Sequence, residues 1–105
     1  MNSKVLSMLG LCRRAGAVII GTDLVTKALP SGKVRLVMYV ADASANTEKK
    51  ITDKCKFYNT RCVKLSYDGM EIAHAIGKLS SVSVVGVTDE NFSRELDLLT
   101  SKETR

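Results

Sequence analysis

The sequence has no tryptophan, and its three tyrosines and two phenylalanines make up only 5% of its 105 residues. Proteins that bind single-stranded nucleic acid without sequence preference use aromatic side chains as platforms on which bases stack. The composition therefore disfavours a binding surface of that kind.

Long hydrophobic runs are absent as well. No apolar run approaches the roughly 20 residues of a membrane span. Residues 1–4 lack the apolar segment of a signal peptide, so we expect a cytoplasmic protein with no membrane partner.

Cysteine and histidine are also scarce. The three cysteines, Cys12, Cys55 and Cys62, form no C-x-x-C pair, and their odd number argues against a disulfide framework. A zinc site would need more ligands than these cysteines and the single His74 supply. We therefore expect buried free thiols in a reducing compartment, with no metal and no cofactor.

The motifs of enzyme active sites are absent. His74 stands between two alanines with no carboxylate or nucleophile at an informative spacing, and no Gly-x-Ser-x-Gly elbow occurs. The glycine at position 21 lacks the further glycines of a dinucleotide-binding loop and the Gly-Lys-Ser/Thr of a P-loop. Asp42 follows an expected strand, but the earlier strand provides no second acid. The sequence thus predicts no catalytic residue and no enzyme.

A basic balance is what the chain does have. Sixteen Lys and Arg stand against eleven Asp and Glu, which gives a net charge of +5. This charge favours a polyanionic partner, which can be RNA, DNA or an anionic membrane surface, and does not choose among them. Hydrophobic residues at 45% and charged residues at 26% are typical of a globular domain, and the length predicts a single domain over residues 1–105.

Helical and strand patterns alternate along the chain. Apolar residues at helical spacing follow Ser3 or Asn2, which can cap a helix that ends near residues 13–16. Further helices are expected over residues 22–29, after Ser44 or Asn46, from the capping-box sequence at Asp68 to Gly77, and after Thr88 or Asp89. Strands are expected at residues 17–20, 34–40, 63–65 and 82–87, and the first of them is expected to be a short buried strand. We expect residues from about 100 to 105 to fray.

This alternation predicts an α/β fold. It is typical of a single-domain three-layer α/β/α sandwich, in which helices cover both faces of a central sheet that here has four strands. Residues 34–40 form a nearly continuous apolar run, which is expected for a strand covered on both faces.

The segment from residue 18 to residue 29 holds the first candidate site. A β-branched run stops at Gly21, a helix begins with Thr22 and Asp23, and Lys27 shares the helix face of Asp23. A helix N-terminus also offers N–H groups that suit phosphate. The same residues equally fit an ordinary junction with a solvated Asp23–Lys27 pair, so spacing alone leaves both interpretations open.

The second candidate is the segment from Gly77 to Ser81. Lys78 and a flexible backbone could reach a ligand there, although a plain surface connection explains the segment as well. The lysines of the third expected helix fit a solvated helix face, and the negative charge of Asp53 partly offsets their positive charge.

Several short motifs together resemble a known family. They are the segments at residues 9–16, 21–27, 42–50 and 72–78, which occur in one order and spacing. The chain from about Lys4 to Leu99 resembles the kink-turn-binding ribosomal protein family called L-seven-Ae and, within it, the small bacterial YlxQ-like branch. The resemblance implies a three-layer sandwich that binds the sharply bent RNA called a kink-turn, in ribosomal or regulatory RNA, with the ribosome as a further partner.

The resemblance also implies the residues of the site. Gly21, Thr22 and Lys27 match the family's signature turn, and Lys27 can donate to guanine O6 or N7 at the tandem G·A pairs. Asp42 matches an acidic position after the second strand, and Gly77 with its loop matches the segment that covers flipped-out nucleotides. The expected RNA-binding residues are Gly21, Thr22, Asp23, Leu24, Lys27, Lys33, Asp42, Lys49, Gly77, Lys78 and Leu79.

Two positions depart from the family pattern. Asp23 stands where the family has Asn, so it can accept but not donate a hydrogen bond, and it adds a charge that phosphate repels. Leu24 replaces a Glu and offers no polar contact, and a family Arg after this helix is matched only by Ser31. We expect a monomer with weaker RNA affinity than an archaeal relative. The alternative is a protein-interaction module on the same fold with little RNA binding.

Overall fold

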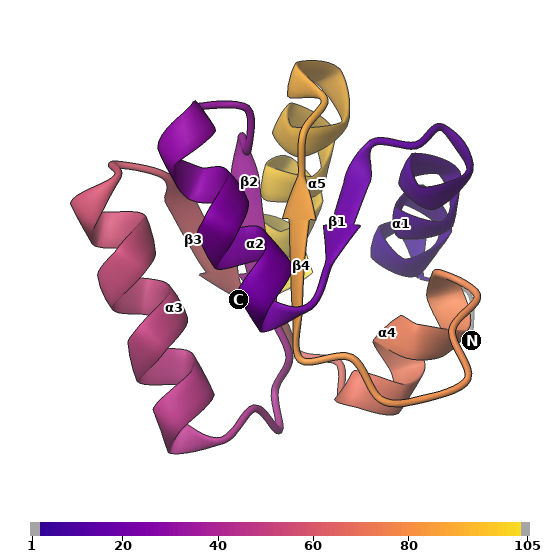
Figure 1. Cartoon of the computed structure of the whole chain (residues 1–105). Coiled ribbons are helices and arrows are strands. Elements are labelled where there is room, and N and C mark those ends of the chain that lie inside the picture. Colours follow the sequence, from indigo (N-terminus) through magenta and orange to yellow (C-terminus); the bar gives the residue numbers. More distant parts are fainter. Residues whose placement is uncertain (1–2, 104–105) are drawn as a thin grey trace.

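The computed structural model describes residues 3–103 and shows the alternation of helices and strands that the sequence predicts (Figure 1). In chain order the elements are α1 (Lys4–Arg14), β1 (Val18–Ile20), α2 (Thr22–Ala28), the 3-10 helix η1 (Leu29–Ser31), β2 (Leu36–Tyr39), α3 (Ala45–Phe57), β3 (Arg61–Lys64), α4 (Gly69–Ala75), β4 (Val84–Val87) and α5 (Glu90–Glu103).

The four strands form one mixed sheet in the order β1-β4-β2-β3. β4 is antiparallel to both of its neighbours, whereas β2 and β3 are parallel. All four residues of β2 are buried, as expected for a strand covered on both faces. The prediction of a buried first strand was wrong, because β1 is an edge strand and its three residues are only half-buried.

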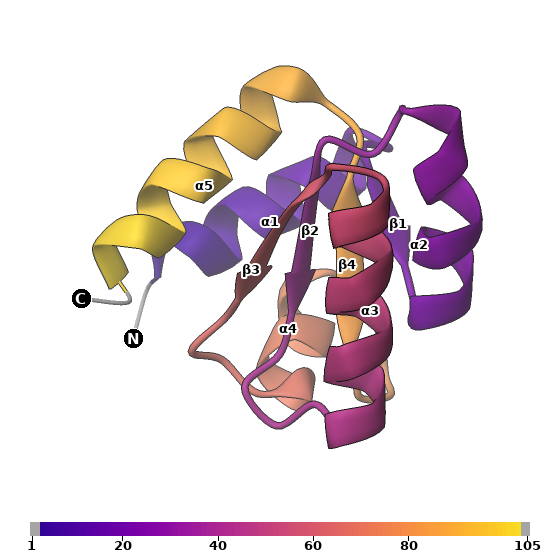
Figure 2. The same cartoon turned by 90° about the vertical axis from the view of Figure 1, so that its left-hand side faces the viewer.

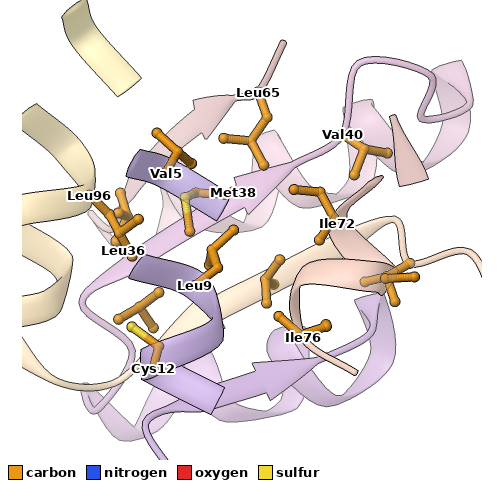
Figure 3. Close-up of a cluster of buried hydrophobic side chains, with 14 residues drawn as sticks. Val5, Leu9, Cys12, Leu36, Met38, Val40, Leu65, Ile72, Ile76 and Leu96 are labelled. Atoms are coloured by element: carbon orange, nitrogen blue, oxygen red, sulfur yellow. The ribbon is translucent and has the colours of Figure 1, made fainter. Parts of the chain in front are cut away.

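Helices cover both faces of this sheet, so the three-layer sandwich is confirmed (Figure 2). α1, α4 and α5 lie on one face, where Leu9, Ile72 and Leu96 pack with Met38 in a single buried cluster (Figure 3). On the other face α2 and α3 pack over the sheet, with buried residues Val25, Leu29, Val37, Ile51 and Val84. Burial of these apolar side chains supplies most of the driving force for folding.

Close packing of α2 on the sheet requires a glycine in β4. A Cβ atom at Gly86 would lie 3.3 Å from the side chains of Val25 and Val34. Gly86 therefore lets α2 approach the sheet closely, which fixes the position of the β1–α2 junction.

Side-chain caps begin the helices where the sequence predicts them. Ser3 Oγ accepts from the N–H of Val5 at 3.1 Å, while the alternative cap Asn2 lies outside the described residues. At α3 the cap is Ser44, whose Oγ accepts from the N–H of Thr47 at 3.2 Å. Asp89 accepts from the N–H of Phe92 at the start of α5. These bonds satisfy backbone donors that have no partner within the helix.

Asp68 and Glu71 form the predicted capping box of α4. The Asp68 side chain accepts from the N–H of Glu71 at 2.8 Å, and the Glu71 side chain accepts from the N–H of Asp68 at 3.0 Å. The two bonds satisfy both donors reciprocally.

The chain ends and element boundaries differ somewhat from expectation. The helix predicted to reach residue 29 ends at Ala28 and continues as η1 through Pro30, and β3 begins two residues earlier than expected. α5 continues to Glu103 where fraying was expected, because Thr100 is buried and its hydroxyl donates to the carbonyl of Leu96 at 2.9 Å. Residues 104–105 of the expected tail lie outside the described part. No helix within residues 3–103 has the length and apolar character needed to cross a membrane.

Candidate RNA interface

Both candidate segments lie at the same end of the sheet. β1, β2 and β3 end there and β4 begins there, because Ile20 pairs with Val85, and Tyr39 pairs with both Val84 and Lys64. The turn after β1 and the connection from α4 to β4 therefore approach each other (Figure 1). We call them the Gly21 turn (residues 21–27) and the 77–82 loop.

The Gly21 turn is fixed to the sheet by its backbone. Gly21 has a φ of +104°, a region that favours glycine, and this conformation turns the chain directly from β1 into α2. Its N–H donates to the carbonyl of Val84 at 2.9 Å, and its own carbonyl accepts from the N–H of Val25 at 3.0 Å. The first turn of α2 is thus held in a defined position next to the start of β4.

α2 presents its predicted contact residues to solvent. Val25 is buried beneath the helix, while Asp23, Leu24 and Lys27 are exposed on its outer surface. Leu24 is 59% exposed, which is unusual for a large apolar side chain on a helix that packs on a core. Thr22, the remaining contact residue predicted in this turn, is half-buried at the helix start.

The predicted Asp23–Lys27 ion pair does not form. Asp23 instead lies 3.5 Å from the ammonium group of Lys50, which belongs to α3. The reason is tertiary packing, because α2 and α3 contact each other on the same face of the sheet. Lys27 forms no ion pair within residues 3–103, so its ammonium group is available to a partner.

The 77–82 loop begins with a second left-handed glycine. Gly77 has a φ of +76°, and the next N–H, that of Lys78, donates to the carbonyl of Ala73 at 2.8 Å and closes the end of α4. Leu79 then projects into solvent with 97% of its surface exposed. The loop is tied down at its far end, where the N–H of Val82 donates to the carbonyl of Gly69 at 3.1 Å.

A hollow lies between the 77–82 loop and the end of β1. Its volume is about 480 Å³, and its lining consists of Ile20, Gly77, Lys78, Leu79, Ser80, Ser81 and Val82. Ile20 is the residue that immediately precedes the Gly21 turn. A ligand seated in the hollow would therefore contact the 77–82 loop and lie next to the start of α2.

Asp42 lies at the same end of the sheet and has an internal partner. Its carboxylate accepts a hydrogen bond from the backbone N–H of Gly69 at 2.9 Å. This bond links the end of β2 to the first residue of α4. Asp42 thus helps to position α4, and through it the 77–82 loop.

Two predicted lysines are placed differently. Lys33 precedes β2, and because β1 and β2 are both antiparallel to β4, the start of β2 lies at the opposite end of the sheet from the Gly21 turn. The structure therefore does not bring Lys33 together with the other predicted residues. Lys49 lies on α3, where it pairs with Asp53 at 3.0 Å on an exposed surface.

Sequence reasoning missed Lys50 and Phe57 on α3. Lys50 is the partner of Asp23, and Phe57 is 79% exposed near the C-terminal end of the helix. The helical spacing of Ile51 and Cys55 predicts which face of α3 is buried. It does not predict that α2 would lie beside the flank that carries Lys50.

The other titratable side chains include His74 and Tyr39. Within residues 3–103 no three His, Cys, Asp or Glu side chains come together as a metal site, and His74 is exposed on α4. Burial and a 3.0 Å hydrogen bond to Glu48 raise the pKa of Tyr39 to about 12, so its hydroxyl stays protonated at neutral pH. Tyr39 and Glu48 thus link the sheet to α3 and serve its packing.

Comparisons with known proteins show which family the chain belongs to. A sequence profile of the ribosomal protein L7Ae/L30e/S12e/Gadd45 family matches residues 3–97. The chain is 42% identical over 89 residues to "RNA-binding protein YlxQ" of Bacillus subtilis (strain 168), covering 85% of this chain and 87% of that protein. It is 31% identical over 86 residues to "Large ribosomal subunit protein eL30" of Sulfolobus acidocaldarius, covering 82% and 83%.

Solved structures show the same fold. A Bacillus halodurans protein described as having unknown function superposes with a TM-score of 0.89 at 38% identity, over 95% of this chain and 99% of that one. The "Giardia lamblia 15.5kD RNA binding protein" superposes with a TM-score of 0.76 at 16% identity, over 97% and 89%, which shows the fold alone. By the extent of its sequence match and by its fold, the chain belongs to the ribosomal protein L7Ae/L30e/S12e/Gadd45 family.

Proposed function

We propose that this protein binds structured RNA that contains a kink-turn, and that it does so without catalysis. The observation that carries the proposal is that the Gly21 turn and the 77–82 loop lie at the same end of the sheet, where the loop and Ile20, the residue before the turn, line a hollow of about 480 Å³. Recognition of a bent RNA needs a surface that touches two parts of the RNA at once, and these two segments supply it.

Lys27 is the residue that reads base edges in this proposal. It is exposed and forms no ion pair within residues 3–103, so its three N–H donors can reach guanine O6 or N7 at the G·A pairs. Leu24 beside it contributes apolar contact only, and Asp23 accepts from exocyclic amines.

Leu79 is the residue that packs on an extruded base. Full exposure of a leucine side chain to water is unfavourable, and a contact with a base face would remove that apolar surface from water. Lys78, next to it in the same loop, is placed to meet a phosphate. The roles thus divide between a base-reading turn and a base-covering loop.

The relatives support RNA as the class of partner. Those of Bacillus subtilis and Enterococcus faecium are named RNA-binding proteins, and that of Sulfolobus acidocaldarius is named a ribosomal protein. The net charge of +5 agrees with a polyanionic partner. We infer that the protein acts as a monomer in the cytoplasm on ribosomal or regulatory RNA, with the ribosome as one place where that RNA occurs.

A titration with two RNAs tests the proposal. The affinity for a kink-turn RNA is compared with that for a plain duplex of equal length, at the same salt concentration. Electrostatic binding treats the two alike, whereas the Gly21 turn and the 77–82 loop should favour the kink-turn. Equal affinities would leave only a generic basic protein. Absence of binding to both at low salt would favour a protein-interaction module.

A further inference from the structure

We propose that the flank of α3 beside α2 is a second RNA contact, which holds an unpaired strand leaving the kink-turn. The inference rests on the proposed function and extends it to a surface outside the Gly21 turn and the 77–82 loop. A hollow of about 560 Å³ marks this flank, and its lining consists of Lys50, Asp53, Lys54, Phe57 and Tyr58.

Phe57 is the more exposed of the two aromatic side chains that line this hollow. Phe57 is 79% exposed, and it contacts Tyr58 edge to face with ring centroids 4.8 Å apart. Despite this contact most of the Phe57 side chain remains exposed, so it is accessible to a further partner. A base stacked on an aromatic side chain is a sequence-tolerant contact, because every base has a π-face. One exposed ring offers a single such contact beside the kink-turn site, and not the series of stacking platforms that the low aromatic content disfavours.

The charges on this flank suit a nucleic-acid strand. Lys54 forms no ion pair within residues 3–103, and it lies one helical turn from both Lys50 and Phe57. Lys50 pairs with Asp23 at 3.5 Å, and Asp53 pairs with Lys49 at 3.0 Å. The side chains of this region thus comprise three lysines and two acids. Of these three lysines, Lys54 is the one without an ion pair in the described part of the chain and the one closest to Phe57 in the sequence.

The flank is continuous with the Gly21 turn. Lys50 lies 3.5 Å from Asp23, in the first turn of α2, and Figure 2 shows α2 and α3 next to each other on the same face of the sheet. From Lys50 to Phe57 the helix rises about 10 Å, at about 1.5 Å per residue. A strand of a few nucleotides that leaves an RNA bound at the Gly21 turn can therefore reach Phe57.

The other flank of α3 supplies a matched control. Lys56 precedes Phe57 in the sequence, but one residue corresponds to about 100° of rotation around a helix. Lys56 is exposed and is absent from the lining of the hollow. Lys56 has the same charge as Lys54 and lies on the same helix, but its side chain does not line the hollow that contains Phe57.

The test compares a kink-turn RNA with four derivatives, each carrying an eight-nucleotide oligouridine extension on one strand end. Wild-type protein and the variants Phe57→Ala, Lys54→Gln and Lys56→Gln are titrated with each RNA by fluorescence anisotropy. We expect the wild type to bind at least one extended RNA about tenfold more tightly than the unextended one. Phe57→Ala should abolish this gain and Lys54→Gln reduce it, with Lys56→Gln retaining it.

Several outcomes would overturn the inference. The first is no gain in affinity from any extension, and the second is a gain in affinity that persists in Phe57→Ala. The third is a loss of this gain in Lys56→Gln equal to that in Lys54→Gln, which would mean diffuse electrostatic attraction. In the first two cases the exposed ring would remain as a contact for another protein. The affinity of all variants for the unextended kink-turn, compared with that for a plain duplex, tests the proposed function separately. The melting temperatures of the variants should stay close to that of the wild type.

Discussion

Asp23 carries the most informative single departure from the family pattern. The sequence suggested that its charge would be offset by Lys27, but the structure places Lys50 of α3 at 3.5 Å instead. The Asp23 side chain remains 85% exposed, so the pair is a surface contact of at most about 1 kcal/mol. Asp23 is therefore free to respond to RNA, and its carboxylate brings a negative charge close to phosphates.

We predict that Asp23→Asn strengthens kink-turn binding. The change removes a negative charge and adds a donor, and one additional hydrogen bond in the complex contributes on the order of 1 kcal/mol. Because the removed repulsion is screened by ions, the advantage should grow at lower salt. Isothermal titration of both proteins at two salt concentrations measures it. Weaker binding by the variant would show that the carboxylate itself makes a needed contact.

The three thiols differ in environment. Burial and the charge of Asp89 raise the pKa of Cys12 to about 11. A hydrogen bond between Cys55 and Cys62 lowers the pKa of Cys62 below its ordinary value and, together with burial, raises that of Cys55. Cys62 is also the half-buried member of the set, since Cys12 and Cys55 are buried.

We predict that iodoacetamide modifies Cys62 first. The thiolate is the reacting form, so a lowered pKa shifts the rise of the labelling rate to lower pH than for an ordinary thiol, whereas Cys12 should stay unreactive until the pH approaches 11. Peptide mass spectrometry after timed labelling at pH 8 gives the order. In denaturant the three cysteines should react alike. Faster labelling of Cys12 or Cys55 in the native protein would contradict this description.

At the scale of elements, α4 links the fold to the site. Its first residue, Gly69, donates its N–H to the Asp42 carboxylate and accepts at its carbonyl from the N–H of Val82, the last residue of the 77–82 loop. A Cβ atom at Gly69 would lie 2.1 Å from Ser81 Oγ and 3.0 Å from the carbonyl of Val82. Gly69 is therefore required by the close approach of the 77–82 loop to α4.

We predict that Gly69→Ala lowers the free energy of unfolding by about 1 kcal/mol, since the Ser81 hydroxyl must leave its position and the Val82 carbonyl at 3.0 Å, which is backbone, must shift. The displaced segment belongs to the 77–82 loop, so kink-turn affinity should fall as well. Urea unfolding and RNA titration measure the two effects.

The double variant Gly69→Ala with Ser81→Gly is the control, because it removes the closest clashing atom and should recover part of both losses. Full stability and full affinity in the single variant would show that the loop moves away without consequence.

The sequence predicts the start of a helix correctly where a single capping residue determines it. Ser44, Asp68 and Asp89 cap helices as the sequence predicts, because capping depends on a side chain and backbone donors two or three residues away. α5 extends beyond its expected end because Thr100 is buried against the rest of the fold, and that is a tertiary effect. The burial of β1 was overestimated because an apolar run does not reveal an edge position.

For the whole molecule, the alternation of helices and strands predicted the three-layer class but not the strand order. The order β1-β4-β2-β3 places the Gly21 turn and the 77–82 loop at one end of the sheet. It also places Lys33 at the opposite end, although Lys33 follows Lys27 by only six residues. Distances of that kind depend on the long-range pairing of strands, so the sequence predicts candidate residues but not how they are arranged in space.

The central claim is that Lys27 in the Gly21 turn reads the G·A pairs of a kink-turn. A cycle of four titrations tests it most directly, with wild type and Lys27→Ala each measured on the kink-turn RNA and on the same RNA with its G·A pairs changed to Watson–Crick pairs. Lys27→Ala should lose about 1–3 kcal/mol of binding on the kink-turn. On the altered RNA it should lose little, and its fold should be intact because an exposed lysine adds little stability.

Lys56→Ala, which removes an exposed lysine away from the turn, serves as the control and should affect both RNAs slightly and equally. We therefore expect a coupling of at least about 1 kcal/mol between Lys27 and the G·A pairs. Equal losses for Lys27→Ala on the two RNAs, or equal losses for Lys27→Ala and Lys56→Ala on the kink-turn, would contradict it.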